Sequence, residues 1–185
     1  CGLDVLILPA DENYPDSVFV EDTALLTPEV AILTNPGAAS RQGEIISVEE
    51  TIREFFDHLE FIRDPGTLEA GDVMMAGSHY FIGLSGRTNV EGGRQLVSLL
   101  EAHGMSGSII EISEMLHLKS GISYLENNTM LLTEGLSNHP AFRDFNRIPV
   151  PLQEVYAANS VWINNTVLVP SGYPKTLKRI IQAGY

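Results

Sequence analysis

The feature that most constrains the fold is a pattern of two short apolar strands around a tight turn, which occurs four times. Turn residues such as Asn-Asn or Gly-Ser separate the two strands of a copy, and a small polar segment follows them. Short strands joined by such turns are typical of β-hairpins. Their recurrence at roughly 40–50 residues predicts a propeller-like or another repeat architecture. The expected hairpins cover residues 19–34, 71–84, 123–132 and 159–169.

Helices are expected between these hairpins. Ser47 and Glu50 are spaced as a capping box, which predicts a helix that continues through Leu59. Asn89 can cap a second helix, which should stop at Gly104. The alternation of hairpins and helices predicts an α/β fold.

The two ends of the chain resemble cuts at equivalent points of a repeat. Residues 175–183 predict a third long helix that stops at Gly184, and strands are expected at 5–8 and 108–112. Gly2 resembles a helix-ending glycine that lacks its helix, and Gly184 one that lacks its following strand. We therefore expect about four units of a larger ring in one domain that is truncated at both ends. A complete α+β domain is the alternative.

An acidic segment with the sequence DSVFVED, residues 16–22, predicts a binding site. Its apolar centre, 18–20, is expected to be a buried strand with carboxylates at both ends. Asp16 and Asp22 would share one face of a regular strand and Glu21 would lie on the other. The strand must therefore end or bulge near Glu21 if all three carboxylates are to meet one ligand. We interpret the segment as part of a cation-binding site; a solvated strand end is the alternative.

The charge balance limits the classes of partner. The chain has 11 Lys plus Arg against 24 Asp plus Glu, a formal net charge of -13. This argues against nucleic acid or an anionic membrane and favours a small cationic substrate. A cytoplasmic location fits the absence of a membrane-span-length apolar run and of an opening signal peptide. Cys1 is the only cysteine, which excludes a disulfide framework and cysteine-based zinc sites.

Other polar segments stand beside the expected strands. Glu69 and Asp72 flank a glycine before one strand, His117 precedes another, and Arg41 and Arg87 follow the first two hairpins. Taken singly, each of them could be a loop or surface residue. In a cyclic arrangement, equivalent points of each unit converge on the axis, so we expect these groups to face one another.

Four motifs together resemble the dimethylarginine dimethylaminohydrolase family of the guanidine-modifying (amidinotransferase) superfamily. They are the acidic segment 16–22, LEAGDV at 68–73, SGRTN at 85–89 and HLKS at 117–120, and they cover essentially the whole chain in the order found in the family. The resemblance implies a pseudo-symmetric five-bladed α/β propeller, the pentein fold. Residues 1–185 would form a single such domain, incomplete with about four repeat units.

The resemblance also implies a role for each residue. Asp22 and Glu69 would bind a guanidinium group through paired charge-assisted hydrogen bonds, and His117 would transfer protons. Asp72 would shape its turn. The implied catalytic residues are His117 and Glu69, and the implied substrate-binding residues are Asp16 and Glu21 for the α-amino end, Asp22 for the guanidinium, and Arg41 and Arg87 for the α-carboxylate.

The implied reaction is hydrolysis of an N-methylated arginine to citrulline and a methylamine through a cysteine-bound intermediate. No metal or organic cofactor is implied, and a homodimer is compatible with the resemblance. The nucleophilic cysteine of the family lies near its C-terminus, and this chain ends at Tyr185 before any such residue. Cys1 is a poor substitute, and the lid expected near the N-terminus is absent too, so we expect the 185 residues alone to be inactive.

Two other functions are open. One is another arginine- or citrulline-processing hydrolase of the same superfamily, which would share the carboxylate pair. The other is a non-catalytic binder of arginine-like amino acids. His117 argues against the binder, because a partly cationic imidazole adds nothing to the recognition of a cation.

Overall fold

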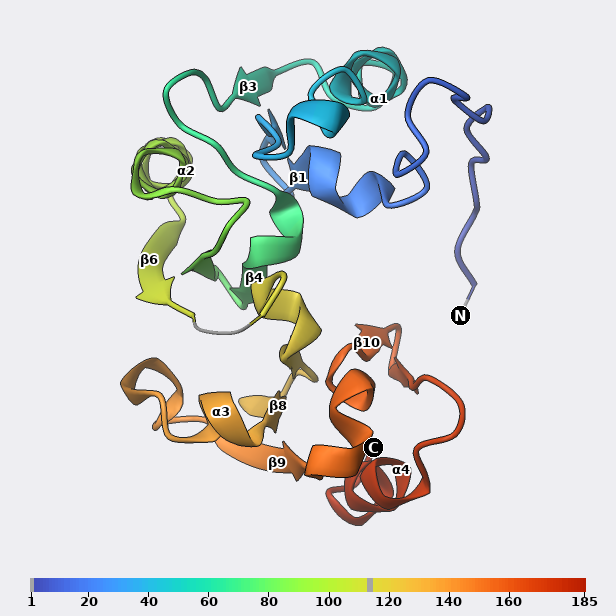
Figure 1. The fold of residues 1–185 in the computed structure, drawn as a ribbon. Helices are drawn as coiled ribbons and strands as arrows, with labels where there is room; N and C mark the ends of the chain where they lie inside the picture. Colours follow the sequence, from blue (N-terminus) through green and yellow to red (C-terminus); the bar gives the residue numbers. More distant parts are fainter. Residues whose placement is uncertain (1, 113–114) are drawn as a thin grey trace.

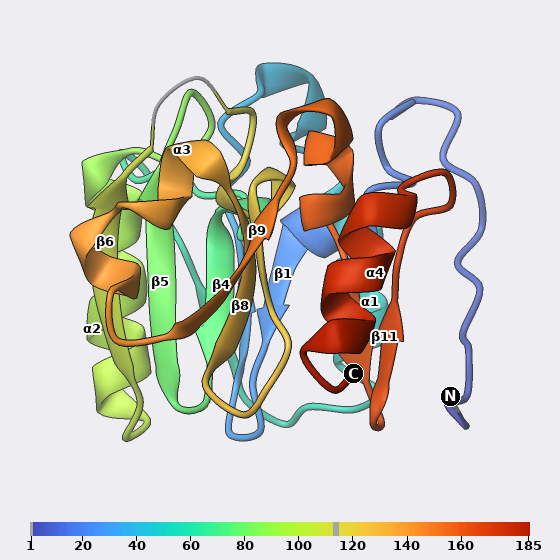
Figure 2. The same ribbon diagram turned by 90° about the horizontal axis from the view of Figure 1, so that it is seen from below.

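The computed structural model describes residues 2–112 and 115–185, so Cys1 lies outside the described residues. It has a mixed α/β fold in which four hairpin units follow one another around a common axis (Figure 1). The first strands β1, β4 and β10 lie on the inner side of this arrangement, and α1, α2 and α4 lie on the outer side. Viewed at right angles, the strands of the different units run in roughly the same direction (Figure 2).

All four expected hairpins are present, since β1–β2, β4–β5, β7–β8 and β10–β11 pair antiparallel. In the first three units a third strand pairs parallel with the second strand, giving three-stranded sheets. The strands are β1 (Ala24–Leu26), β2 (Ala31–Leu33), β3 (Leu59–Phe61), β4 (Val73–Ala76), β5 (His79–Leu84), β6 (Ser106–Glu111), β7 (Ile122–Tyr124), β8 (Thr129–Thr133), β9 (Asn146–Val150), β10 (Val161–Ile163) and β11 (Thr166–Leu168).

Each helix connects the second strand of a unit to the strand that follows it in the chain, or closes the fourth unit. Such a crossover is needed because parallel strands cannot be joined by a tight turn. The helices are α1 (Ile45–Ile52), α2 (Val90–Ala102), α3 (Glu134–Ser137) and α4 (Pro174–Gln182). No helix in the described part of the chain is long and apolar enough to cross a membrane.

The apolar core is divided into layers between consecutive units. In β5, Ile82 belongs to the cluster shared with the first unit, whereas its neighbour Phe81 belongs to the cluster shared with the third unit. In β8, Leu132 and Leu131 divide in the same way between the second and fourth units. Because alternate side chains of a strand point to opposite faces, each central sheet stabilises two interfaces at once.

The acidic segment does not form the expected buried strand. Its last residues belong to a 3-10 helix, η1 (Val20–Thr23), and Val18 and Phe19 are 77% and 59% exposed. The amide of Phe19 donates to the carbonyl of Asp16, and the amide of Asp22 donates to the carbonyl of Phe19. These local turns use the backbone groups that a strand would offer to a neighbour, and strand pairing begins only at Ala24.

The prediction for the first helix was also wrong in its bounds. Helix α1 starts before Ser47, whose side chain makes no cap, and ends at Ile52. The helix cannot continue through Leu59, because residues 59–61 pair with β2 as β3. The strand expected at 5–8 is absent, and this segment runs without regular structure beside the first unit.

The predictions for the other two long helices are confirmed. Asn89 caps α2 by accepting from the amide of Gly92 at 2.8 Å, and Gly104 follows the helix at φ +75°. The third helix, expected over 175–183, is α4.

We expect Asn89→Ala to lower the free energy of unfolding by about 1–2 kcal/mol, because the side chain also accepts from Thr67 and donates to the carbonyl of Pro65. Urea unfolding followed by circular dichroism measures the change. Ser47→Ala is the matched control, with an expected change of less than about 0.5 kcal/mol. Equal losses in the two variants would contradict the assignment of the cap.

Candidate active site

One pocket lies where the polar turns before the first strands of the units meet. It contains every residue predicted for the site. These are Asp16, Glu21, Asp22, Arg41, Glu69, Arg87 and His117. The turns occupy equivalent places in successive units, and they bring together residues that are distant in the sequence.

Two buried carboxylates and an imidazole form the centre of the pocket. His117 Nε2 lies 2.9 Å from Glu69 Oε2 and 3.9 Å from Asp22 Oδ1. Glu69 is fully buried and Asp22 nearly so. Buried carboxylates with unused acceptor capacity are suited to a planar cation that carries several donors.

Mutual electrostatics control the protonation of this centre. Burial by itself disfavours the charged imidazole, but the hydrogen bond to Glu69 and the negative charges of Asp22 and Asp72 outweigh burial and raise the pKa of His117 above its usual value. Burial would likewise raise the pKa of Glu69, yet the hydrogen bonds from His117 and the Ala38 amide, with the positive charge of Arg87, lower it. Both shifts favour an imidazolium beside an ionised carboxylate.

Arg41 lies in the pocket wall but is occupied by acidic partners. Its Nη1 donates to Asp22 Oδ2 at 2.7 Å, and its Nη2 donates to Glu44 Oε2 at 2.7 Å. A further bond from Nη2 reaches the carbonyl of Phe19 at 3.1 Å. Burial opposes the charge on Arg41, but the hydrogen bonds that it donates to Glu44 and Asp22 raise its pKa further. The structure thus directs this guanidinium toward protein acceptors, whereas the sequence-based role was to bind a substrate carboxylate.

Arg87 is the more accessible arginine. Its side chain is 32% exposed, and Nη1 approaches Glu69 Oε1 at 3.4 Å. Its backbone is held closely, since a Cβ on Gly37 would lie 2.3 Å from the Arg87 carbonyl oxygen. A fixed backbone with a partly free guanidinium leaves Arg87 able to bind an anionic group at the mouth of the pocket.

Asp72 connects the second and third units, as expected of a turn-shaping residue. Its buried carboxylate accepts from the hydroxyls of Ser85 and Thr88, at 2.6 and 2.7 Å, and from the amide of Leu118 at 2.9 Å. Burial raises the pKa of Asp72. The two hydroxyls flank Arg87 in the sequence and Leu118 follows His117, so one carboxylate positions both sides of the pocket.

Residue 71 must be a glycine, because the side chains of Asp22 and His117 lie where a Cβ would be. Its amide donates to Asp22 Oδ1 at 2.9 Å. A Cβ at this position would lie 2.5 Å from that oxygen and 2.9 Å from His117 Cγ. Any side chain here would therefore push the carboxylate and the imidazole apart.

The two remaining predicted residues lie at the outer part of the pocket. The side chain of Asp16 is exposed, and its carbonyl accepts from Arg41. Glu21 is 67% exposed at its side chain and pairs with Lys119 at 2.8 Å, which connects the first and third units. The carboxylate of Glu21 is thus paired with Lys119, whereas its sequence-based role was at the α-amino end of a substrate.

Sequence reasoning missed several residues of the site. No sequence pattern marks Glu44 as a site residue, because its role depends on the buried ion pair with Arg41. Ser120, Tyr156 and Asn159 also line the pocket. The last two precede the first strand of the fourth hairpin, as His117 precedes that of the third, so the same repeat rule would have found them.

The donor atoms of Asp22, Glu69 and His117 lie within 4.8 Å of one another, the one grouping among the described residues with the spacing to hold a metal ion. Here the two carboxylates pair instead with Arg41 and Arg87.

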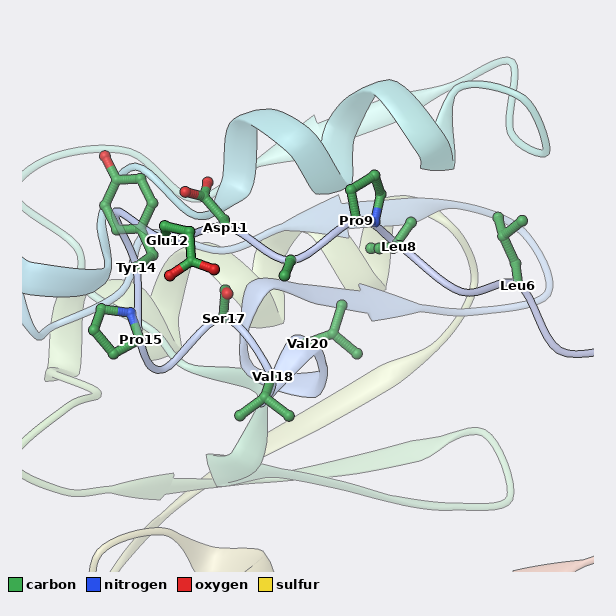
Figure 3. A pocket seen from close by; sticks show the side chains of 11 residues that line it. Leu6, Leu8, Pro9, Asp11, Glu12, Tyr14, Pro15, Ser17, Val18 and Val20 are labelled. Carbon is green, nitrogen blue, oxygen red and sulfur yellow. The ribbon is translucent and has the colours of Figure 1, made fainter.

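A second pocket lies beside the first, under the N-terminal segment (Figure 3). Leu6, Leu8 and Pro9 line it on one side, and Val18 and Val20 line it on the other. Its wall is mainly apolar and lacks the imidazole and arginines of the acidic pocket. The chemistry of the site therefore belongs to the acidic pocket.

Comparisons with known proteins agree with this geometry. The chain is 50% identical over 186 residues to N(G),N(G)-dimethylarginine dimethylaminohydrolase of Pseudomonas aeruginosa, covering 100% of this chain and 73% of the relative. The Streptomyces coelicolor protein of that name is 36% identical over 189 residues, covering 100% and 70%. No family model matches.

Solved structures share the α/β fold. A variant of the Pseudomonas aeruginosa enzyme in complex with citrulline superposes with a TM-score of 0.94 at 51% identity, over 96% of this chain and 70% of that one. The N-terminal domain of a cyanobacterial arginine dihydrolase has a TM-score of 0.83 at 20% identity, over 96% and 69%, which shows a common fold.

We expect Glu69→Gln to lower the pKa of His117, because the variant replaces the charged acceptor of the imidazole hydrogen bond with a neutral one. NMR titration of the imidazole signals measures this pKa, and Glu29→Gln, an exposed change in the first hairpin turn, is the control variant. An unchanged His117 pKa would contradict the electrostatic account of the centre.

The same pKa shift predicts how stability depends on pH. A raised folded-state pKa means that protonated His117 stabilises the fold fully below its unfolded pKa of about 6.5. This contribution is lost as the pH rises through the folded pKa. The difference in unfolding free energy between the wild type and His117→Asn should therefore shrink above that pH, and a difference that grows with pH would contradict the assignment.

Proposed function

The chain belongs to the dimethylarginine dimethylaminohydrolase family, and we propose that its acidic pocket binds and hydrolyses a methylated arginine to citrulline and a methylamine. The observation that supports this function best is the contact of His117 with Glu69, with Asp22 adjacent, at the centre of a pocket that carries an accessible arginine. A planar cation and a proton-transfer step need these groups together.

In this proposal the guanidinium of the substrate lies between Asp22 and Glu69. Each carboxylate accepts N–H bonds from the cation, and burial strengthens these bonds. The amino-acid end points outward, where Asp16 meets the α-amino group with Glu21 nearby, and Arg87 meets the α-carboxylate.

His117 donates a proton in the first half of the reaction and accepts one in the second half. The thiolate of the family's cysteine attacks the guanidinium carbon, and the imidazolium donates its proton to the departing methylamine. The neutral imidazole then takes a proton from water, whose oxygen attacks the same carbon and expels the thiolate. As the adduct collapses, its hydroxyl proton passes to the released amine in solution, so neutral citrulline leaves and the thiolate and imidazolium are restored. The raised pKa of His117 favours the acid needed for the first step.

Arg41 contributes to substrate binding from within the wall. Its bond to Asp22 holds one oxygen of that carboxylate, which orients the other toward the pocket. It could contact the α-carboxylate only by exchanging Asp22 or Glu44 for it, because both acids already occupy its guanidinium.

We further propose that residues 1–185 form one domain with the pentein arrangement, in which the four units stand for four of five blades. Three three-stranded sheets and a two-stranded sheet in sequence order support it. A cytoplasmic location, a homodimeric state and the lack of nucleic-acid or membrane partners stay predictions from the sequence.

Ligand binding tests the guanidinium site. We expect the 185-residue chain to bind dimethylarginine and citrulline, and Asp22→Asn to weaken dimethylarginine about tenfold or more, because a buried charge pair with the ligand is lost. Isothermal titration calorimetry measures the affinities. Glu29→Gln, an exposed change in the first hairpin turn, is the control and should have no effect.

Turnover tests the chemistry. We expect no citrulline from the 185 residues, whose only cysteine is Cys1, and turnover by a version that also carries the family's C-terminal cysteine. In that version His117→Asn should lower kcat more than affinity, whereas Asp22→Asn should lower both. Citrulline formation by the 185-residue chain that persists after Cys1→Ser would overturn the mechanism, and tight binding without turnover in the longer version would favour a binding protein.

A further inference from the structure

The four units place one residue each at the same point around the pocket. Asp22, Gly71, Ser120 and Asn159 all lie two residues before the first strand of their unit, and all four line the acidic pocket. The backbone hydrogen bonds support this equivalence. In the first and third units, the residue directly after the shared position accepts a hydrogen bond through its carbonyl oxygen. The carbonyl of Thr23 accepts from Thr34, and that of Gly121 accepts from Thr133.

A local turn shapes three of these positions in the same way. The amide of Asp22 donates to the carbonyl of Phe19 at 3.1 Å, and that of Ser120 donates to the carbonyl of His117 at 3.1 Å. In the fourth unit the amide of Asn159 donates to the carbonyl of Tyr156 at 3.2 Å. Asn159 is therefore the fourth-unit equivalent of Asp22, and Tyr156 is the equivalent of His117.

The deep end of the pocket surrounds the reacting group. Gly71 donates its amide to Asp22, and the same glycine is packed against the ring of His117. Asp22 lies 3.9 Å from the imidazole. Two of the four equivalent positions, Asp22 and Gly71, thus lie at the imidazole, whereas the exposed Asp16 lies at the outer part of the pocket.

Asn159 is available for a ligand. Its side chain is exposed to the pocket and makes no hydrogen bond with another residue of the described chain, 2–112 and 115–185. Its segment is anchored from behind, because the buried Glu154 accepts from the amide and hydroxyl of Thr176 at the start of α4, each at 2.7 Å. A carboxamide on an anchored turn can both donate and accept.

We propose that Asn159 is a substrate-binding residue, whose carboxamide bonds the guanidinium of the substrate and the ureido group of the product. The inference rests on the proposed function. The amide oxygen accepts from a guanidinium N–H, and the amide nitrogen donates to the ureido oxygen of citrulline. The neutral side chain recognises both the charged and the uncharged ligand, which a third carboxylate would not do.

Calorimetry with citrulline and dimethylarginine tests the proposal. Asn159→Ala should weaken both ligands about tenfold, because one hydrogen bond to each is lost. Asn159→Asp should weaken citrulline by a similar factor, since the donor is gone, and should leave dimethylarginine at least as tightly bound. Asn138→Ala, an exposed asparagine after α3 and outside the pocket, is the matched control with no expected change.

The outcomes separate the inference from the proposed function. A wild type that binds neither ligand would refute the proposed function itself. A wild type that binds both, with unchanged affinities in Asn159→Ala, would overturn only the role of Asn159. The NMR signals of the Asn159 side-chain NH2 group give a measurement without a variant: they should shift on citrulline binding, and signals that do not move would overturn the proposal.

Discussion

The buried carboxylate of Asp72 is the interaction on which the geometry of the pocket depends. It accepts three hydrogen bonds, from Ser85, Thr88 and Leu118, and therefore joins the second unit to the third. The hydroxyl of Thr88 in turn accepts from the amide of Glu69. A buried carboxylate without these donors would be costly, so the turns that carry Glu69, Arg87 and His117 are stable only when they are together.

The charged groups at the centre of the pocket are paired with one another, even though the chain as a whole is acidic. Three carboxylates face two guanidinium groups and one imidazole, and each cation contacts at least one carboxylate. A cationic ligand must therefore compete with a resident cation for the same oxygens. Arg87 is the most exposed of these cations, and its nearest carboxylate oxygen, at 3.4 Å, is farther away than those of Arg41 and His117, so Arg87 can yield most readily. The carboxylates are Asp22, Glu44 and Glu69, and the resident cations are Arg41, Arg87 and His117.

The parts of the structure that the sequence predicted are those determined locally or by the repeat. Turn residues specify the four hairpins, and Asn89 marks its helix, because both depend on neighbours in the chain. The repeat alone brought the distant residues of the site to one place. The strand expected at 18–20 failed because apolar composition does not show whether a partner strand exists. The engagement of Arg41 by Glu44 and Asp22 depends on tertiary burial, which no local pattern reports.

The division of the core into layers has a consequence for divergence among relatives. Side chains of one layer contact those of the two adjoining units, while the pocket is built by turns before the strands. Apolar side chains of a layer can thus be substituted together with the side chains that they contact, as in other repeat folds, without moving the turns. A fold that persists at 20% identity with a TM-score of 0.83 is what such a separation permits. Relatives must then preserve the number of residues between each pocket turn and the strand after it more strictly than the composition of the core.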